Sequence, residues 1–552
     1  MRNYIILIFI GALLFIPFLG AVHLFDWDEI NFAESAREML LTHNFSRVQI
    51  NFQPFWEKPP LFIWMQALSM MVFGVNEFAA RFPNAIAGIL TLCLIYHVGT
   101  TWKDSRMGWL WVWMYIGSFL PHLYFKSGII DPWFNLFIFA GIFQLSKLSN
   151  RNNYRDLKRL RIAAAAGLFI GLAVLTKGPV ALLVSVICLI VVWIRGRMVS
   201  IIQWKEIFTF LIIAGLISSA WFALETLKNG PWFIVTFIKY QLRLMSTEDS
   251  GHGGPIYYHF VVLLLGCFPA SIFALGAFKQ DLSESYVSRN GKLWMSTLII
   301  VVLVIFSLVK TKIIHYSSLA WFPLTYLGAF YLNKLLYTTQ KSFKWYHLGG
   351  LFLIGTAYAV ALFVIPFVDI FKAQIEPFIG DKFGKAALYA NVHWNPWLSL
   401  VGVIFFMILL ISILLLRNMR SQLLGLGLLL FSTIVSVQCI AYLYLPNIEG
   451  YSQRAAIDFF KSKQNENCTV EVLGYKSYAQ YFYTMKQEPK DTNESRTYYL
   501  LTHNSNKPAY FISKIDRYEE PMKNYHLIKT GEANGFVFLK KETPPDTSQS
   551  AR

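Results

Sequence analysis

Long apolar runs separated by short polar stretches dominate this sequence and restrict what it can fold into. The first run, from Tyr4 to Phe25, has 22 residues and no charged side chain, which is enough for a helix to cross roughly 30 Å of hydrocarbon. It lacks an A-x-A-like cleavage site, so we interpret it as a retained membrane span and not as a signal peptide. Twelve further runs lie near residues 78–100, 108–125, 130–146, 162–176, 179–194, 207–223, 257–278, 293–309, 315–332, 346–367, 396–416 and 421–445. The sequence therefore predicts an α-helical polytopic membrane protein with about thirteen transmembrane helices.

The composition agrees with a membrane protein. Hydrophobic residues make up 55% of the 552 residues and charged residues only 15%, whereas a soluble chain has roughly 25% charged residues. The net charge of +17 is compatible with nucleic-acid binding, but such proteins gather their basic residues on one soluble face. Here the basic residues lie between apolar runs, so we expect a membrane partner and no nucleic acid. The five cysteines lack the paired spacing of a disulfide framework or a CxxC metal site.

The charges of alternate loops indicate the orientation. With the N-terminus in the cytoplasm, the inner loops hold 20 basic residues and five acidic ones, as the positive-inside rule requires. The first outer loop, 26–58, holds six acidic residues and three basic ones. An odd number of spans then places residues 446–552 on the outer side.

The polar C-terminal region predicts a small domain. Residues 1–445 would form the transmembrane domain, 446–541 a small α/β domain on the periplasmic side, and the Pro/Ser/Thr-rich residues 542–552 a disordered tail. The expected elements are helices near 452–463 and Ser477–Tyr483, strands at Thr469–Gly474, Thr497–Leu501 and Ala509–Ser513, and a closing hairpin around the turn Glu532-Ala-Asn-Gly. There is no Walker or GxGxxG motif, which argues against an ATP-driven pump.

The first outer loop, 23–60, carries an unusual density of acidic residues. The segment from Asp26 to Met39 predicts an interfacial helix with Asp26 as N-cap and Glu29 as its capping partner. Its apolar residues would face lipid or protein. A helix alone does not explain three acidic residues within four positions beside a bilayer.

Two ordered motifs in this loop resemble a known enzyme family. They are Asp28-Glu29 followed by Phe32-Ala33-Glu34 and Arg37-Glu38-Met39, and then Glu57-Lys58-Pro59 after Trp56. The order and spacing resemble those of the bacterial lipid A 4-amino-4-deoxy-L-arabinose transferases, within the wider protein O-mannosyltransferase superfamily. The resemblance implies a GT-C glycosyltransferase in the bacterial inner membrane whose donor is a sugar linked to polyprenyl (undecaprenyl) phosphate.

The chemistry of such a donor needs an anion and a cation at the outer interface. A carboxylate takes the acceptor proton, and cations stabilise the leaving phosphate. The resemblance implies catalytic positions at Asp28, Glu29 and Asp131, and a contact from Lys58 to the donor phosphate. The alternatives are a helix-capping role for Asp28 and a snorkelling interfacial role for Lys58.

Lysines at the predicted outer ends of spans point to the same chemistry, since the positive-inside rule makes them scarce there. They occur in sharp turns that also look like family motifs lining the donor cavity. The alternative is that each turn is an ordinary loop end. The candidate substrate-binding residues are Lys58, Lys126, Lys177, Lys310, Lys312 and Tyr316.

The Gly-rich loop within 224–256 predicts a lid that orders when donor binds. In the resembling family a histidine of this loop, with the glutamate of the Glu-Lys-Pro motif, holds zinc. This implies Glu57 and His252 as zinc ligands here. Two protein ligands make a sparse site, so a solvated loop histidine is the alternative.

The acceptor is left open by the sequence. Lipid A or another envelope glycolipid would be glycosylated by a pentosyl- or hexosyltransferase, and Ser/Thr of secreted proteins would be modified by a protein O-mannosyltransferase-like enzyme. A transporter would need ionisable residues near the bilayer midplane and repeat symmetry, and the charges gather instead at one face. We expect a monomer.

Overall fold

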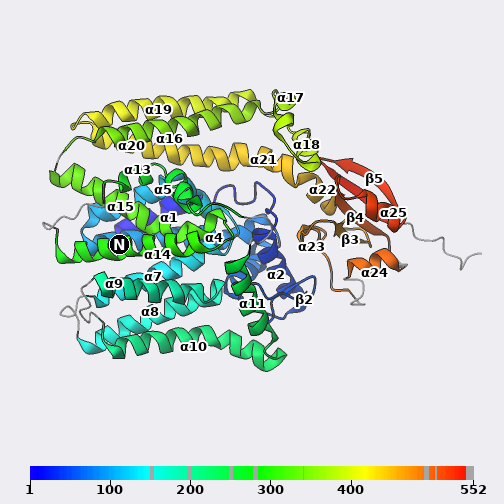
Figure 1. Ribbon diagram of the computed structural model, residues 1–552, viewed down its shortest axis with the longest axis horizontal. Coiled ribbons are helices and arrows are strands. Elements are labelled where there is room, and N and C mark those ends of the chain that lie inside the picture. Colours follow the sequence, from blue (N-terminus) through cyan, green and yellow to red (C-terminus); the bar gives the residue numbers. More distant parts are fainter. Residues whose placement is uncertain are drawn as a thin grey trace, which may run out of the picture.

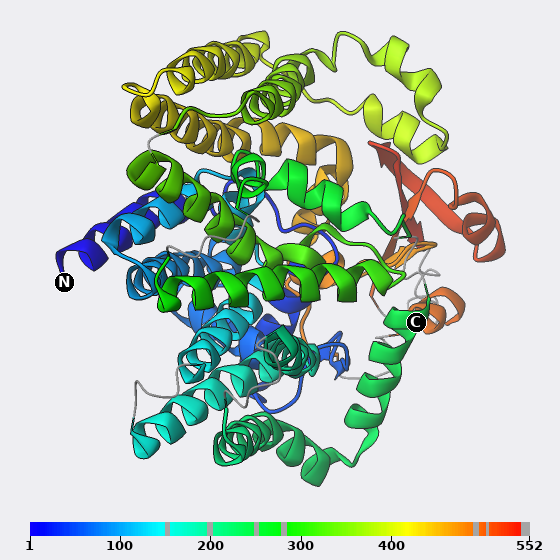
Figure 2. The same ribbon diagram turned by 60° about the vertical axis from the view of Figure 1, so that its left-hand side comes forward.

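The computed structural model describes residues 1–149, 155–195, 202–247, 253–277, 284–339, 341–489, 496–503 and 507–541. Helices run side by side in a long bundle, with a small sheet-containing domain at one end (Figure 1). The N-terminus and the turn between α19 (Ser399–Arg417) and α20 (Gln422–Cys439) lie at the opposite end (Figures 1 and 2). This separation fits the predicted orientation, in which that turn and that terminus share one side of the membrane.

The expected apolar runs all coincide with helical structure. The bundle is built from α1 (Arg2–Phe15), α3 (Leu61–Phe73), α4 (Glu77–Trp102), α5 (Ser105–Ile116), α6 (Phe119–Leu123), η1 (Tyr124–Lys126), α7 (Asp131–Leu148), α8 (Asp156–Lys177), α9 (Val180–Arg195), α10 (Trp204–Asn229), α11 (Trp232–Ser246), α12 (Tyr258–Gly266), α13 (Ala270–Ala274), α14 (Tyr286–Leu308), η2 (Ile314–Ala320), α15 (Trp321–Asn333), α16 (Trp345–Val364), α19 and α20. Beyond the bundle proper lie α17 (Lys372–Ile375), α18 (Lys382–Leu388) and α21 (Leu445–Ser452).

The polytopic membrane architecture is confirmed, but the number of thirteen spans is not. Within the described ranges seven helices are long and apolar enough to cross a membrane, or eight if the bent pair Phe119–Lys126 and Asp131–Leu148 is one span. Several expected runs are broken: α1 ends at Phe15 shortly before Pro17, and the run 257–278 divides between α12 and α13 at Pro269. Proline disfavours helix at and before its own position, so an apolar run is not always one continuous helix.

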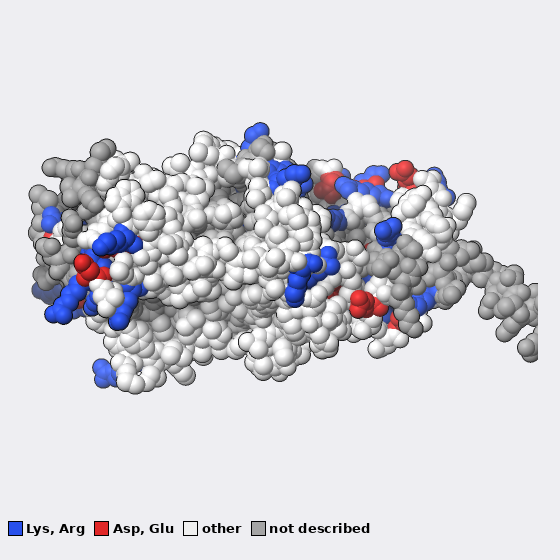
Figure 3. All heavy atoms as spheres, turned by 90° about the horizontal axis from the view of Figure 1, so that it is seen from below, with Lys and Arg blue, Asp and Glu red and all other residues white. Residues whose placement is uncertain are grey.

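The surface of the bundle has the character expected of a membrane-embedded protein. Figure 3 shows a broad uncharged band across this face, with charged side chains gathered toward the two ends. Large apolar side chains are exposed along the outer helices, among them Leu216 of α10, Leu353 of α16 and Leu414 of α19. Contiguous exposed apolar surface of this extent is rare on soluble monomers, and it marks the side that faces lipid.

The C-terminal domain is a four-stranded mixed sheet with strand order β3-β4-β6-β5. Strands β3 (Thr469–Leu473) and β4 (Ala509–Lys514) are parallel, while β5 (Leu527–Ala533) and β6 (Phe536–Lys541) form an antiparallel hairpin. The hairpin turn has Asn534 and Gly535 at positive φ, the conformation that favours an Asn-Gly pair. The expected hairpin and the strands at 469–474 and 509–513 are confirmed.

Helices cover both faces of this sheet. One face packs on α22 (Arg454–Ser462) and α23 (Ala479–Tyr483), through Tyr510 and Ile512. The other packs on α24 (Thr497–Thr502), through Ala509 and Phe511, with α25 (Glu519–Asn524) beside β5. The prediction of a strand at Thr497–Leu501 is therefore wrong, because this segment is helix α24. A parallel β3–β4 pair needs a crossover connection, which is usually helical. The tail 542–552 lies outside the described residues.

The outer loop is embedded between the bundle and the C-terminal domain. Its helix α2 (Asp28–Thr42) packs on α3 and on α23, and the short strands β1 (Gln49–Ile50) and β2 (Gln53–Pro54) follow it. Most α2 residues are buried, polar ones included. The expected helix is present, and its apolar residues face protein, one of the two expected surroundings. Asp26 is not its N-cap: the helix is preceded by Trp27, without a side-chain cap.

Candidate active site

Segments far apart in the chain meet at the end of the bundle that faces the C-terminal domain. Asp28 is the first residue of α2, Asp131 the first residue of α7, and Lys177 the last residue of α8. His315 and Tyr316 come from η2. Helix N-termini favour carboxylates and C-termini favour cations, so the ends of α7 and α8 suit the charges that they carry.

Two carboxylates face one imidazole in this cluster. Nε2 of His315 lies 3.3 Å from Oδ2 of Asp28 and 3.9 Å from Oδ2 of Asp131. The other oxygen of Asp131, Oδ1, accepts a 2.5 Å hydrogen bond from Nζ of Lys177. The Asp131 side chain is 3% exposed and that of Asp28 is 35% exposed. Asp131 is thus a buried anchor, and Asp28 is the carboxylate that a substrate can reach.

A cavity of about 90 Å³ opens beside these groups. Its polar side is formed by Lys58, Asp131, Lys177, Tyr316 and Gln241. Its apolar side consists of Phe134, Ile138, Val180, Val184, Phe306, Val309 and Leu319. One cavity therefore places two ammonium groups next to an apolar wall, an arrangement suited to an amphipathic anion.

Aromatic rings hold the two lysines of the cavity. Nζ of Lys177 lies 5.2 Å from the ring centre of Tyr316 and 5.8 Å from that of Phe134. Nζ of Lys58 lies 5.4 Å from the ring centre of Tyr240, on α11. Such cation–π contacts orient an ammonium group without neutralising it. Lys177 gives one of its three N–H donors to Asp131, which leaves it two donors for an anion.

Glu29 has a different position from its neighbour Asp28. It is 4% exposed and accepts hydrogen bonds from Nε and Nη2 of Arg81, at 3.0 and 2.7 Å, and from the backbone of Phe25 and Gly128. Burial alone would raise the pKa of Glu29, but Arg81 and these N–H groups hold it below its ordinary value. All of this indicates a residue that fixes the loop, and the described geometry gives it no contact with the cavity.

The Glu34-x-x-Arg37-Glu38 motif is likewise internal to α2. Arg37 donates two hydrogen bonds of 2.7 Å to the Glu34 carboxylate, and both side chains are buried. Burial and the nearby Glu34 raise the pKa of Glu38 well above its usual range, while its Oε2 accepts from the Phe52 N–H. This motif stabilises the loop and does not line the cavity.

Three of the expected phosphate-binding lysines lie outside the cavity lining. Lys312 donates from Nζ to the carbonyls of Phe306, Ser307 and Val309, and so caps the C-terminus of α14. Lys126 donates to the carbonyl of Pro17 at 2.9 Å. Lys310 is exposed. A lysine whose donors are taken by carbonyl groups has none left for a phosphate, which sets Lys312 apart from Lys58 and Lys177.

The zinc hypothesis rests on Glu57 and His252, and His252 lies outside the described residues. Oε1 of Glu57 lies 3.9 Å from Nζ of Lys476, and Oε2 accepts a long hydrogen bond of 3.4 Å from Tyr240. Within the described ranges no group of three or more His, Cys, Asp and Glu side chains could hold a metal. Because His252 lies outside these ranges, the zinc site stays a prediction, and no step of the chemistry is derived through a metal.

Two residues of the site were not singled out from the sequence. His315 lies in an outer turn of the sequence, and in the structure it joins Asp28 to Asp131. Lys476 belongs to the C-terminal domain and reaches Glu57 of the first outer loop. The signal for His315 was its place directly before Tyr316, next to two outer lysines. Lys476 had no local signal.

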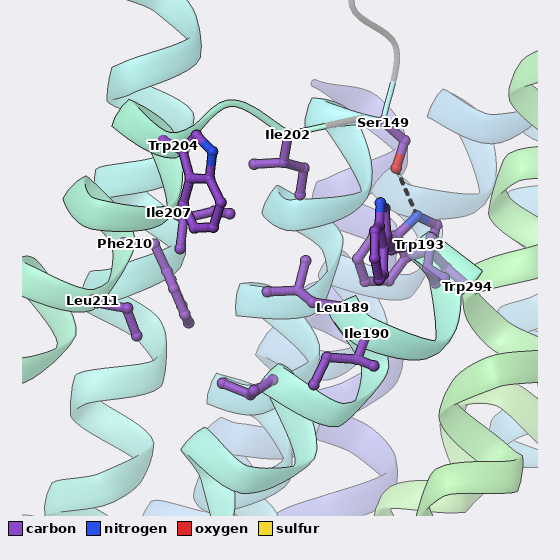
Figure 4. A pocket seen from close by; sticks show the side chains of 12 residues that line it. Ser149, Leu189, Ile190, Trp193, Ile202, Trp204, Ile207, Phe210, Leu211 and Trp294 are labelled. Carbon is purple, nitrogen blue, oxygen red and sulfur yellow. Dashed lines mark hydrogen bonds between the residues drawn. The ribbon is translucent and has the colours of Figure 1, made fainter. Parts of the chain in front are cut away.

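A roomier cavity than the one beside Asp131 lies elsewhere in the bundle. It measures about 540 Å³ and lies among α9, α10 and α14 (Figure 4). Trp193, Trp204 and Trp294 and aliphatic side chains line it, and Nε1 of Trp294 donates to Oγ of Ser149 at 2.9 Å. Among the described residues no titratable side chain lines it. We therefore assign the chemistry to the smaller cavity beside Asp131.

Comparisons with known proteins find similar chains over much of the sequence. Residues 57–222 match the family model described as dolichyl-phosphate-mannose-protein mannosyltransferase. The chain is 26% identical over 389 residues to an undecaprenyl phosphate-alpha-4-amino-4-deoxy-L-arabinose arabinosyl transferase of Shewanella sediminis, covering 69% of this chain and 66% of that protein. The same identity holds over 344 residues for the transferase of that name from Pectobacterium carotovorum, covering 61% of this chain and 60% of the relative. The chain thus aligns with less than two thirds of the length of these relatives.

Solved structures show the same fold over nearly the whole chain. The crystal structure of ArnT from Cupriavidus metallidurans bound to undecaprenyl phosphate matches with a TM-score of 0.76 at 17% identity, covering 98% of this chain and 99% of that one. The apo form matches with a TM-score of 0.77. The resemblance expected from the outer-loop motifs is confirmed: the chain has the fold of the ArnT structures, residues 57–222 match the mannosyltransferase family model, and the chain is similar to the undecaprenyl phosphate-alpha-4-amino-4-deoxy-L-arabinose arabinosyl transferases.

Proposed function

We propose that this protein is a glycosyltransferase that moves a sugar from an undecaprenyl phosphate donor to an acceptor at the outer face of the inner membrane. The acceptor we propose is lipid A or another envelope glycolipid. One observation carries the proposal: a single cavity joins Lys58 and Lys177 to an apolar wall, with the reachable carboxylate of Asp28 close by. The curated relatives are named as transferases of this kind.

The donor has two parts that match the two sides of the cavity. Its prenyl chain is apolar, like the wall around Ile138, Val184 and Phe306. Its phosphate is the leaving group, and negative charge grows on its bridging oxygen as the bond to the anomeric carbon breaks. Lys58 and Lys177 are placed to stabilise that charge, and preorganised cations in a site closed to water are effective at this.

Asp28 is placed to assist the incoming acceptor. Its carboxylate can accept a proton from the attacking oxygen, or orient that oxygen toward the anomeric carbon. His315 lies between Asp28 and Asp131 and holds the first carboxylate in place through the second. In this proposal Asp28 touches substrate, while His315 and Asp131 are positioning residues and Glu29 fixes the loop through Arg81.

The proposed orientation places the cavity and the C-terminal domain in the periplasm. The support is the charge pattern of the loops and the position of the domain at the end opposite the N-terminus (Figure 1). The protein would act as a monomer there, since donor and acceptor both lie in the same membrane.

Reconstitution tests the proposal directly. Purified protein in nanodiscs receives undecaprenyl phosphate linked to a pentose or a hexose, and either a glycolipid acceptor or a Ser/Thr-containing peptide. We expect mass spectrometry to find the glycolipid heavier by one sugar. Glycosylation of the peptide alone would favour the protein O-mannosyltransferase-like alternative, and transfer to neither acceptor would refute the proposal. Envelope lipids from cells with and without the gene should differ by the same sugar.

A further inference from the structure

The C-terminal domain contacts the outer loop directly beside Asp28. The backbone N–H of Asp26 donates to Gln453 at 3.2 Å, and that of Leu24 donates to the Tyr483 hydroxyl at 2.7 Å. The partly buried Asp26 carboxylate packs against Ser477 and Tyr478, and its loss of contact with water raises its pKa. The segment before Asp28 is therefore held by the C-terminal domain, and residues of that domain border the site.

Trp27 lies at this junction in a strained conformation. Its φ of 74° lies in a region that bulky L-residues rarely adopt. The residue is nevertheless 38% exposed. Strain of this kind persists where the surroundings hold a residue for a function. Packing alone does not explain a strained tryptophan that leaves a third of its surface to solvent.

Lys476 completes a small exposed platform with Trp27. Its Nζ lies 4.8 Å from the Trp27 ring centre and 5.4 Å from that of Tyr478. The carboxylate of Glu57 is 3.9 Å away from this ammonium group, and the Lys476 side chain is 49% exposed. A loose, half-exposed ion pair of this kind contributes little to stability. The ammonium group can therefore turn toward a bound anion at small cost.

We propose that Trp27 and Lys476 bind an anionic sugar unit of the acceptor, such as a phosphorylated glucosamine, beside Asp28. The aromatic ring offers an apolar surface to the sugar ring, and the ammonium group pairs with its phosphate. This inference rests on the proposed function and assigns the acceptor side of the site to the junction with the C-terminal domain. The donor side remains at Lys58 and Lys177.

Binding without turnover tests this inference. The full-length Asp28→Asn protein in nanodiscs, without donor, is titrated with a bisphosphorylated glucosamine-disaccharide lipid and with its dephosphorylated form. We expect tighter binding of the phosphorylated lipid, with an affinity that falls as salt screens the exposed lysine. Adding Lys476→Met should weaken binding of that lipid about tenfold, the order expected for one charge-assisted hydrogen bond, and leave the dephosphorylated lipid unaffected.

Two further variants separate binding from folding. Lys529→Met removes another half-exposed lysine of the same domain, one that pairs with Glu532 at 2.6 Å, and should leave both affinities unchanged. Trp27→Gly relieves the positive φ, so thermal stability should hold or rise while the phosphorylated lipid binds more weakly. A fall in affinity with retained stability cannot come from misfolding.

The possible results distinguish a failure of this inference from a failure of the proposed function. Equal affinity for the two lipids in the Asp28→Asn protein, or an unchanged affinity in both Lys476→Met and Trp27→Gly, would overturn the inference. If the wild-type protein still transfers sugar to the phosphorylated lipid in that case, the proposed function stands without this subsite. If the wild-type protein neither binds nor glycosylates the lipid, the proposed function and the inference fail together.

Discussion

The charge on Asp28 can be removed with almost no change in shape by the substitution Asp28→Asn. The residue is the first of α2, and its Oδ2 lies 3.3 Å from Nε2 of His315. Loss of one preorganised group that acts mainly in the transition state costs on the order of 10²–10³ in rate, about 2.7–4 kcal/mol. We expect kcat for sugar transfer to fall by this factor, with the KM for donor little changed.

The same substitution should leave the fold intact. The Asp28 side chain is 35% exposed, and partly exposed ion pairs contribute about 0–1 kcal/mol. Asn and Asp also behave alike near helix N-termini. The matched control is Glu77→Gln, because Glu77 is a first-turn acid of α4 that pairs with Lys461 at 3.4 Å, outside the site. It should retain full activity and a similar melting temperature.

A double substitution tests how His315 acts. If His315 works by orienting Asp28, His315→Gln should slow transfer in the wild-type protein and have almost no further effect in Asp28→Asn, since residues that share one interaction are not additive. The assay is single-turnover transfer in nanodiscs, with melting temperatures measured on the same samples. Near-normal turnover in Asp28→Asn, with the fold preserved, would refute the role of this carboxylate and place the chemistry elsewhere.

Four other outcomes follow from the structure. Lys58→Ala should abolish transfer and weaken donor binding, and Lys58→Arg should rescue it partly, because the charge is kept and the geometry changes; normal donor affinity in Lys58→Ala would contradict the phosphate contact. A C-terminal alkaline phosphatase fusion should be active and a cytoplasmic reporter at the same site dark, and the reverse pattern would refute the orientation. If Glu57 and His252 hold zinc, elemental analysis should find metal that is lost in His252→Ala, whereas metal-free active protein would exclude this. The pKa of Glu38 is raised in the folded protein. Its contribution to stability is therefore full below the unfolded pKa of about 4.3 and is lost as the pH rises through the folded pKa. Glu38→Gln should flatten this fall in melting temperature with pH, and an unchanged pH profile would show that Glu38 is ionised.

Local pattern was sufficient for much of the fold. The apolar runs, the loop charges and the Asn534-Gly535 turn depend on neighbours in sequence. In the structure the runs form helices, the charges gather toward the ends of the bundle, and the turn closes a hairpin. The motif around Asp28 and Lys58 also identified the loop that forms the site. The number of spans and the helix α24 could not be predicted from local pattern. The breaks in helices at prolines and the structure of crossover connections depend on the parts of the protein that pack around them.

The candidate site shows the same division at the level of side chains. Sequence placed five lysines at outer ends of spans, and only Lys58 and Lys177 line the cavity. Lys312 lies only four residues before Tyr316 in the sequence, yet its ammonium group caps α14 and does not line the cavity. Which partner a charged side chain finds is set by the groups within a few ångströms of it, and those come from distant segments.

The sequence by itself determined that this chain enters a membrane and which loop carries the acidic and Glu-Lys-Pro motifs, because hydropathy and the order of residues in a motif are properties of short stretches of chain. Only the tertiary structure decided that Glu29 pairs with Arg81 and that His315 joins Asp28 to Asp131. It also decided that Lys476 contacts the first outer loop, more than four hundred residues away in the sequence. These contacts depend on how the helix ends of the bundle and the C-terminal domain meet in space, and spacing along the chain does not encode that meeting.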